Sequence, residues 1–229
     1  MAGSMVKFAT NGRMAEGYLA LPPSGKGPGL IVLQEWWGLV DHIKSLADRF
    51  AAEGFVALAP DLYHGDKTTS PDQAGKLLMA LNIAETGKDL RGAATYLRAH
   101  AAVTPKKVAA LGFCMGGQLA LFAGQEHPDV VDAVVDFYGI HPKVTIDPAR
   151  VKVPVLGHFS VSDTSVPLAT VRSLAAAVRE AGGSFALHEY DAPHAFFNDS
   201  RPQVYDAACA KLALERTLAF LRKQLAGGT

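Results

Sequence analysis

The chain alternates between short apolar runs and helical stripes from residue 28 to its C-terminus. Strands that are buried on both faces of a parallel sheet have nearly continuous apolar runs of this kind. Such runs cover 29–33, 55–59, 108–113, 130–137 and 153–159, and 185–190 is a further candidate strand. Nearer the N-terminus, 6–9 and 13–21 flank Asn11-Gly12, a dipeptide typical of a hairpin turn. We therefore expect a mostly parallel sheet with an antiparallel hairpin at one edge.

Helical stripes lie between these runs. Ile43, Leu46 and Phe50 recur at the spacing of one helix face, which predicts a helix before the second buried strand. The segment 200–203 resembles a capping box with Pro202 at the first helical position, and it predicts that a long C-terminal helix begins there. Further helices are expected over 71–101, 115–126 and 167–181. Alternating strands and helices predict a doubly wound α/β fold with helices on both faces, in one domain over 1–229.

Composition excludes several classes of protein. With 49% apolar and 19% charged residues, the 229-residue chain is too apolar to be disordered. Twenty-two basic and 22 acidic residues cancel, which argues against a broad basic surface for nucleic acid. No apolar stretch approaches the ~20 residues of a membrane span, and the N-terminus lacks a signal-peptide pattern. We expect a cytoplasmic protein, in which residues 1–4, before the second methionine, are a cloning remnant.

The two cysteines, Cys114 and Cys209, differ in their settings. They form no Cys-x-x-Cys pair, which disfavours a disulfide scaffold or a zinc site, and no His-Glu-x-x-His motif is present. We therefore predict neither a metal nor a cofactor. Cys209 belongs to an alanine-rich helical pattern and is expected to be an inert core residue.

Cys114 lies in Gly-x-Cys-x-Gly, between an apolar run and a helical pattern. This is the pattern of a nucleophile elbow, with cysteine in place of serine. Gly112 and Gly116 remove side chains that would collide with the strand and the helix. The helix N-terminus favours a thiolate by up to ~1 kcal/mol, and the amide of Met115 is placed to bind an oxyanion. The simpler alternative is an ordinary strand-to-helix turn with a buried cysteine.

The order of the remaining residues favours the elbow. In α/β-hydrolases the acid and then the histidine follow later strands, and here Ser162-Asp163 and His194 each follow an apolar run. His158 and His188 fall inside predicted strands and are expected to be structural. Asp191 and Asp199 compete with Asp163, but an acid on the histidine loop is more often a solvated turn residue.

The first buried run ends in Gln34-Glu35-Trp36-Trp37-Gly38. This position is where the second oxyanion amide is expected. We infer that Glu35 faces the thiol and modulates its ionisation, that Trp36 offers its amide, and that Trp37 lines the pocket. The alternative is that Glu35 pairs with a nearby cation while the tryptophans pack under a loop.

The chain resembles the dienelactone hydrolase (carboxymethylenebutenolidase) family of the α/β-hydrolase superfamily. The residues that carry the resemblance are Gln34 to Gly38, Ala59 to Tyr63, Gly112 to Gly117, Phe137 to Gly139, Ser162-Asp163, His194 to Phe196 and Glu215 to Thr217. By this resemblance Cys114, Asp163 and His194 form the triad, Glu35 takes part in thiol activation, and the amides of Trp36 and Met115 form the oxyanion hole. Tyr63, Tyr138, Trp37 and Phe197 would flank the substrate.

The resemblance also implies a reaction, the hydrolysis of dienelactone to maleylacetate. Family members that act on this substrate hold its carboxylate with arginines, one of them shortly after the histidine, where this chain has Phe197 and Asn198. The nearest cation, Arg201, is a candidate substrate-binding residue, with a surface role as the alternative. This difference favours a broader esterase or lactonase, since a bidentate arginine is not replaced by asparagine without loss of charge selection.

The leading hypothesis is a cofactor-free thiol hydrolase of small lactones or esters, acting as a monomer or a small homo-oligomer. A broad-specificity carboxylesterase is one alternative. A second is a catalytically silent relative that binds a small ligand, although the complete set of Cys114, Asp163 and His194 argues against it. A third makes Cys114 a peroxide-reactive thiol, which the lack of an evident resolving cysteine weakens.

Overall fold

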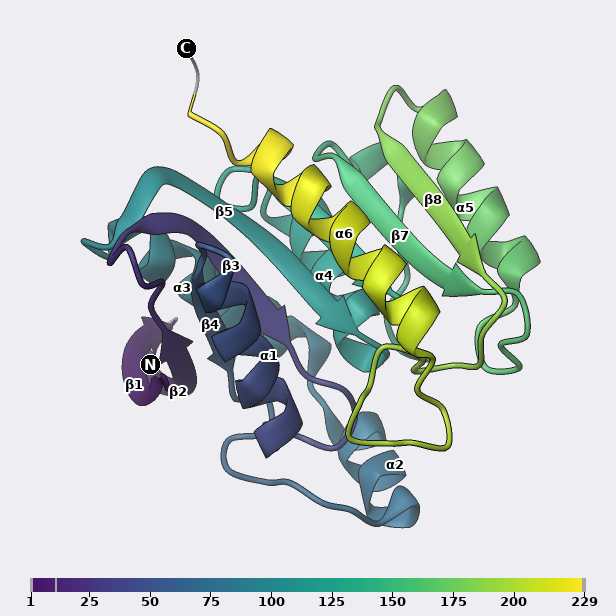
Figure 1. The fold of residues 1–229 in the computed structure, drawn as a ribbon, viewed down its shortest axis with the longest axis horizontal. Helices are drawn as coiled ribbons and strands as arrows, with labels where there is room; N and C mark the ends of the chain where they lie inside the picture. The colour runs from purple at the N-terminus through teal and green to yellow at the C-terminus, as the bar shows by residue number, and fades with distance from the viewer. Residues whose placement is uncertain (1, 11, 228–229) are drawn as a thin grey trace.

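In the computed structural model, one sheet of eight strands runs through the molecule (Figure 1). The structure describes residues 2–10 and 12–227, so Met1 of the predicted cloning remnant and Asn11 of the predicted hairpin turn lie outside the described residues. The strands are β1 Ser4–Thr10, β2 Arg13–Ala20, β3 Gly27–Leu33, β4 Val56–Pro60, β5 Val103–Phe113, β6 Ala133–Phe137, β7 Val155–Ser160 and β8 Phe185–Tyr190. Each predicted strand segment therefore overlaps an observed strand.

The strand order is β1-β2-β4-β3-β5-β6-β7-β8. Strand β2 pairs antiparallel with both β1 and β4, whereas the strands from β4 to β8 pair in parallel. The predicted parallel sheet with an antiparallel edge is confirmed. Because parallel strands end at one edge of the sheet, the segments that follow β3, β5, β7 and β8 are brought to that edge.

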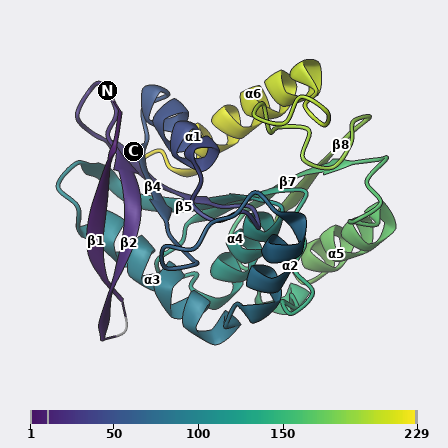
Figure 2. The same ribbon diagram turned by 90° about the horizontal axis from the view of Figure 1, so that it is seen from below.

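Helices cover both faces of the sheet (Figure 2). They are α1 Asp41–Ala52, α2 Pro71–Ala80, α3 Ile83–Ala99, α4 Met115–Glu126, α5 Leu168–Glu180 and α6 Ala207–Gln224, with a 3₁₀ turn at Pro148–Arg150. Helices α1 and α6 lie on one face, and α2 to α5 lie on the other. Neighbouring residues of β3 divide between the two apolar cores: Leu30 packs with α1 and α6, and Ile31 packs with α3 and α4. Burial on both faces explains the continuous apolar runs.

The helix expected over 71–101 is wrong as a single element. It is divided at Leu81 and Asn82 into α2 and α3. The side chain of Asn82 accepts a hydrogen bond from the amide of Glu85 and so caps the start of α3. Asparagine caps a helix in this way because its side-chain oxygen satisfies an amide that has no partner in the first turn.

The C-terminal helix begins later than predicted. Its N-cap is Asp206, whose carboxylate accepts a hydrogen bond from the amide of Cys209. The segment that resembled a capping box forms turns instead, and the Ser200 hydroxyl donates to the side chain of Asn198. Cys209 follows in the first turn of α6 and is half-buried, so it is less enclosed than the predicted core residue.

Candidate active site

Cys114 occupies a sharp turn between β5 and α4. Its backbone has a φ of 54° and a ψ of −119°. A residue with a side chain rarely adopts this conformation, so the turn stores strain, which is common at functional sites. Its amide donates to the carbonyl of Phe137 on neighbouring β6, at 3.0 Å, and this bond holds the turn against the sheet. Cys114 is partly exposed, so the residue is not sealed in the interior.

Two glycines allow the backbone to pass through this turn. A Cβ atom on Gly116 would lie 2.5 Å from the carbonyl oxygen of Leu33, and one on Gly112 would collide with the carbonyl of Gly116. These obstacles are main-chain atoms, which cannot move aside as a flexible side chain can. The glycines therefore bring the start of α4 close to the end of β3.

His194 and Asp163 meet at the same edge of the sheet. His194 Nδ1 lies 2.5 Å from Asp163 Oδ2, although the two residues follow different strands, β8 and β7. Asp163 Oδ1 accepts the amides of Ser165 and Val166 at 2.7 and 3.1 Å. The carboxylate is thus fixed on one oxygen by the backbone and on the other by the imidazole. Burial acts to raise the pKa of Asp163, but these hydrogen bonds outweigh it and the pKa is lowered.

The imidazole of His194 also interacts with Cys114. Burial acts to lower the pKa of His194, but the hydrogen bond to Asp163 and the nearby Cys114 sulfur raise it to about 10. The geometry therefore brings together the three residues predicted as a triad. An imidazole held in this way can exchange a proton with the sulfur on one side while the carboxylate keeps its orientation on the other.

Glu35 lies beside this group in the segment after β3. Strands β3 and β5 are paired neighbours, with Leu33 opposite Gly112, which places Glu35 next to the elbow. The Glu35 side chain is buried, and its Oε2 accepts a 2.7 Å hydrogen bond from Asn198 Nδ2. Burial raises the pKa of Glu35, partly offset by this hydrogen bond and by the positive charges of His194 and Arg201. The direct partner of Glu35 is therefore the neutral side-chain amide of Asn198, and not a cation as in the alternative.

The two predicted oxyanion donors lie on the segments that meet at the elbow. Met115 is the first residue of α4, so its backbone amide has no hydrogen-bond acceptor within the helix and can donate to a bound group. Trp36 belongs to the turn after β3, and its ring packs against that of Trp37 with centroids 5.0 Å apart.

The residues expected to flank the substrate are not equally placed. Trp37 and Arg201 line one cavity, and the Arg201 guanidinium lies 5.4 Å from the Trp37 ring centroid. Tyr63 is buried, and its hydroxyl donates to the Met115 sulfur at 3.1 Å. Tyr138 is also buried, with a strained φ of 43° and a ring centroid 5.0 Å from that of His194. No described residue accepts or donates a hydrogen bond at its hydroxyl.

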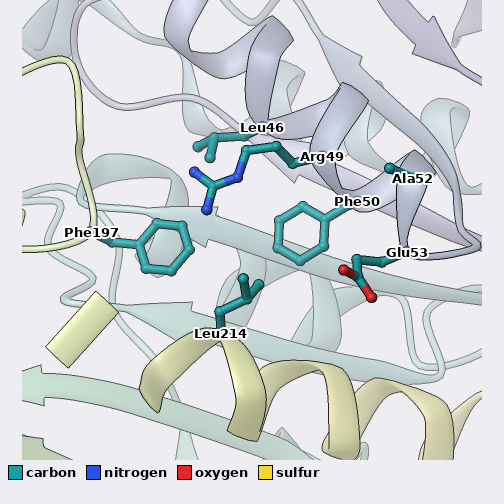
Figure 3. A pocket seen from close by; sticks show the side chains of 7 residues that line it. All are labelled: Leu46, Arg49, Phe50, Ala52, Glu53, Phe197 and Leu214. Carbon is teal, nitrogen blue, oxygen red and sulfur yellow. The ribbon is translucent and has the colours of Figure 1, made fainter. Parts of the chain in front are cut away.

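Phe197 lies apart from these residues. Its ring is buried and packs against Phe113, with centroids 5.4 Å apart. On its other side it lines a small apolar pocket of about 180 Å³ between α1 and α6 (Figure 3). There the Arg49 guanidinium lies 5.5 Å from the ring centroid. The structure thus gives Phe197 a packing role in the core beside α1.

The cavity beside Glu35 measures about 930 Å³. Its wall includes Trp37, His42, Lys67, Asn198 and Arg201. A space of this size accommodates a small organic molecule, since ligand pockets are commonly ~300–1,000 Å³. Its polar and cationic rim beside an acidic group distinguishes it from the apolar pocket at Phe197.

Asp136 is a buried carboxyl group that the sequence analysis missed. It lies in β6, 1% exposed, near the turn that holds Cys114. Burial raises its pKa to about 7, against the lowering effect of the Gly139 amide, and its Oδ1 has no partner among the described residues. The signal was visible as one acid inside the run Ala133–Phe137.

Asp136 predicts an unusual dependence of stability on pH. An acid with a raised folded pKa stabilises the fold while protonated, so stability is full below its unfolded pKa and declines as pH rises toward about 7. With the ordinary aspartic acid pKa of 3.8 in the unfolded chain, the decline amounts to about 4 kcal/mol. Asp136→Asn is expected to flatten this slope in urea unfolding between about pH 4 and pH 8. The exposed Asp72→Asn serves as the control, and parallel slopes for wild type and Asp136→Asn would contradict the assignment.

Among the described residues, no group of three or more His, Cys, Asp or Glu side chains is arranged to hold a metal ion. None of the described helices combines the length and apolar character needed to cross a bilayer.

Comparison with known proteins identifies relatives along nearly the whole chain. A model of the dienelactone hydrolase family matches residues 15–225. The protein usf of Aquifex pyrophilus is 38% identical over 230 residues, covering 97% of this chain and 99% of the relative. A carboxymethylenebutenolidase of a Pseudomonas species is 33% identical over 222 residues, covering 93% and 91%.

The fold is similar to that of a solved structure as well. The crystal structure of a candidate dienelactone hydrolase from Klebsiella pneumoniae superposes with a TM-score of 0.85 at 28% identity, covering 97% of this chain and all of the other. The mixed α/β fold of this chain is thus similar to that of this relative over nearly its whole length.

Proposed function

The chain belongs to the dienelactone hydrolase family, and we propose that it is a cofactor-free hydrolase that cleaves small carboxylic esters or opens lactones through Cys114, His194 and Asp163. One observation carries this proposal. Cys114 is partly exposed at a strained elbow, its sulfur lies near enough to His194 to influence the pKa of the imidazole, and His194 Nδ1 is 2.5 Å from the Asp163 carboxylate. Nucleophile, base and orienting acid in this order are the constellation that acyl transfer requires.

The chemistry then follows in two half-reactions. The Cys114 thiolate attacks the carbonyl carbon, and the amides of Trp36 and Met115 stabilise the oxyanion that forms. Collapse of this intermediate breaks the ester C–O bond, and the leaving alkoxide takes a proton from His194. A water molecule then attacks the thioester while His194 accepts its proton. Collapse of this second intermediate breaks the C–S bond and releases the acid, and His194 returns the proton to the sulfur. In a lactone the alkoxide stays attached to the acyl group, so one ring-opened product leaves.

Glu35 has a supporting role in this proposal. It is buried beside the elbow and lies close enough to His194 for their charges to interact. A carboxylate in this position takes part in activating the thiol, as the family resemblance implies.

The cavity beside Glu35 is the proposed substrate site. Its cations, Arg201 and Lys67, are compatible with a substrate that carries a carboxylate, but Asn198 cannot supply the bidentate contact of an arginine. We therefore propose a broader range of small esters and lactones than dienelactone alone. Initial rates with dienelactone and with neutral esters of increasing acyl length would measure this range.

Trapping the acyl-enzyme tests the proposed function. After rapid mixing with a chromogenic acetate ester and acid quenching, we expect one acetyl group on the peptide that contains Cys114 and none on the peptide that contains Cys209. Saturable binding with no thioester would contradict the proposal and favour a ligand-binding relative. Peroxide consumption that is faster than ester cleavage would instead favour a redox thiol.

A further inference from the structure

Asn198 is buried beside the reaction centre, yet it has no part in the steps described above. It lies in the segment between β8 and α6, four residues after His194, and is 2% exposed. Its Nδ2 donates to Glu35 Oε2 at 2.7 Å, across 163 positions of sequence. A buried hydrogen bond to a charged group is stronger than a neutral one, and its loss leaves the charge without a partner.

Ser200 fixes the orientation of the Asn198 amide. Asn198 Oδ1 accepts both the Ser200 amide at 3.1 Å and the Ser200 hydroxyl at 2.6 Å. An amide oxygen can only accept, so these two donors hold the oxygen on the Ser200 side and turn the NH₂ group toward Glu35. The backbone N–H of Asn198 also donates to the Ala195 carbonyl at 2.9 Å, which fixes the backbone of the same turn.

The other charged and titratable groups near Glu35 do not replace this contact. His194 and Arg201, from the same segment, act on Glu35 through their charges. Tyr138, which follows β6, is influenced by the Glu35 charge. Asp41, His42 and Lys67 line the same cavity. Among the described side chains, only Asn198 forms a hydrogen bond with the Glu35 carboxylate.

We propose that Asn198, oriented by Ser200, is a positioning residue that fixes the Glu35 carboxylate beside the reaction centre and favours its ionised form. This inference rests on the proposed function, in which Glu35 assists activation of the thiol. A neutral donor stabilises the carboxylate without adding a cation, so Glu35 keeps its negative charge and its ability to accept a proton. The small turn at Asn198 and Ser200 therefore sets the pH range over which Cys114 is reactive.

The test is the pH profile of Asn198→Ala. Loss of the donor leaves burial to disfavour the charged form of Glu35, so the acidic limb of kcat/KM for a neutral ester is expected to move up by about one pH unit. Ser200→Ala is expected to move it in the same direction by less, and Ser200→Thr, which keeps a hydroxyl, is expected to restore the wild-type profile. Asn82→Ala, at the remote cap of α3, is the matched control and is expected to leave the limb in place.

A second measurement separates this inference from the proposed function. The rate at which iodoacetamide alkylates Cys114 is followed by peptide mass spectrometry across the same pH range, with Cys209 as an internal reference. We expect the Asn198→Ala shift at Cys114 and not at Cys209. Superimposable Cys114 profiles for wild type and Asn198→Ala would overturn the role of Asn198, whether or not the ester is hydrolysed. If wild type forms no thioester but the Cys114 alkylation profiles of wild type and Asn198→Ala still differ, only the proposed function is overturned.

Discussion

Cys114→Ala is expected to lower kcat for a chromogenic ester on the order of 10⁶-fold, which is the loss seen when a nucleophile is removed from a triad. The alanine retains the elbow, because Gly112 and Gly116, which allow its close backbone contacts, are unchanged. What is lost is the sulfur that forms the covalent intermediate. Steady-state hydrolysis at neutral pH, corrected for the uncatalysed reaction, measures the effect.

Cys209→Ala provides the matched control, because it removes the other thiol from the half-buried first turn of α6. It is expected to retain wild-type turnover. Equal turnover by Cys114→Ala and wild type would contradict the thiol mechanism. An equal loss of turnover in both cysteine variants would indicate a general effect on the fold.

Asp163→Asn is expected to lower kcat about 10⁴-fold, as the corresponding change does in serine triads. The asparagine NH₂ group can meet His194 Nδ1 only as a donor, so it favours the tautomer that carries the proton on the wrong nitrogen. It also removes the negative charge that holds the pKa of His194 at about 10, and the pKa is expected to fall toward the ordinary value of 6.5. Turnover measurements and NMR titration of the imidazole test both effects.

The same substitution affects stability with a definite sign. Because the folded pKa of His194 is raised, its contribution to stability is complete below about pH 6.5 and disappears as pH rises through about 10. Asp163→Asn is therefore expected to weaken the fold more at neutral pH than above pH 10. Asp191→Asn, on the histidine loop, serves as the control. A larger loss of turnover in Asp191→Asn than in Asp163→Asn would contradict the assignment of Asp163 as the acid of the triad.

The strands and the elbow could be predicted because their signals are local. Continuous apolar runs identify strands that are buried on both faces, and Gly112 and Gly116 reveal a turn in which the backbone leaves no room for side chains. The edge at which Asp163 and His194 meet follows from parallel pairing, which brings the ends of β7 and β8 together. Local pattern and topology were therefore sufficient to bring the proposed triad into one place.

Other features depend on contacts that no local pattern contains. The division between α2 and α3 lies at Asn82, whose side chain caps the start of α3. The Ser200 hydroxyl, predicted as part of a helix cap, donates instead to the Asn198 side chain. Helix α6 begins at Ala207, after its cap Asp206. The hydrogen bond from Asn198 to Glu35 joins residues 163 positions apart, which only the folded sheet brings together.

The crowding around the elbow has a consequence for laboratory evolution. At Gly112 and Gly116 an added methyl group meets main-chain oxygens, so a library that randomises these positions is expected to return glycine almost exclusively. Thr69 and Gln203, on the cavity wall, lie outside the strands and helices. New substrate preferences should therefore arise at this rim, while the reacting atoms keep the same positions.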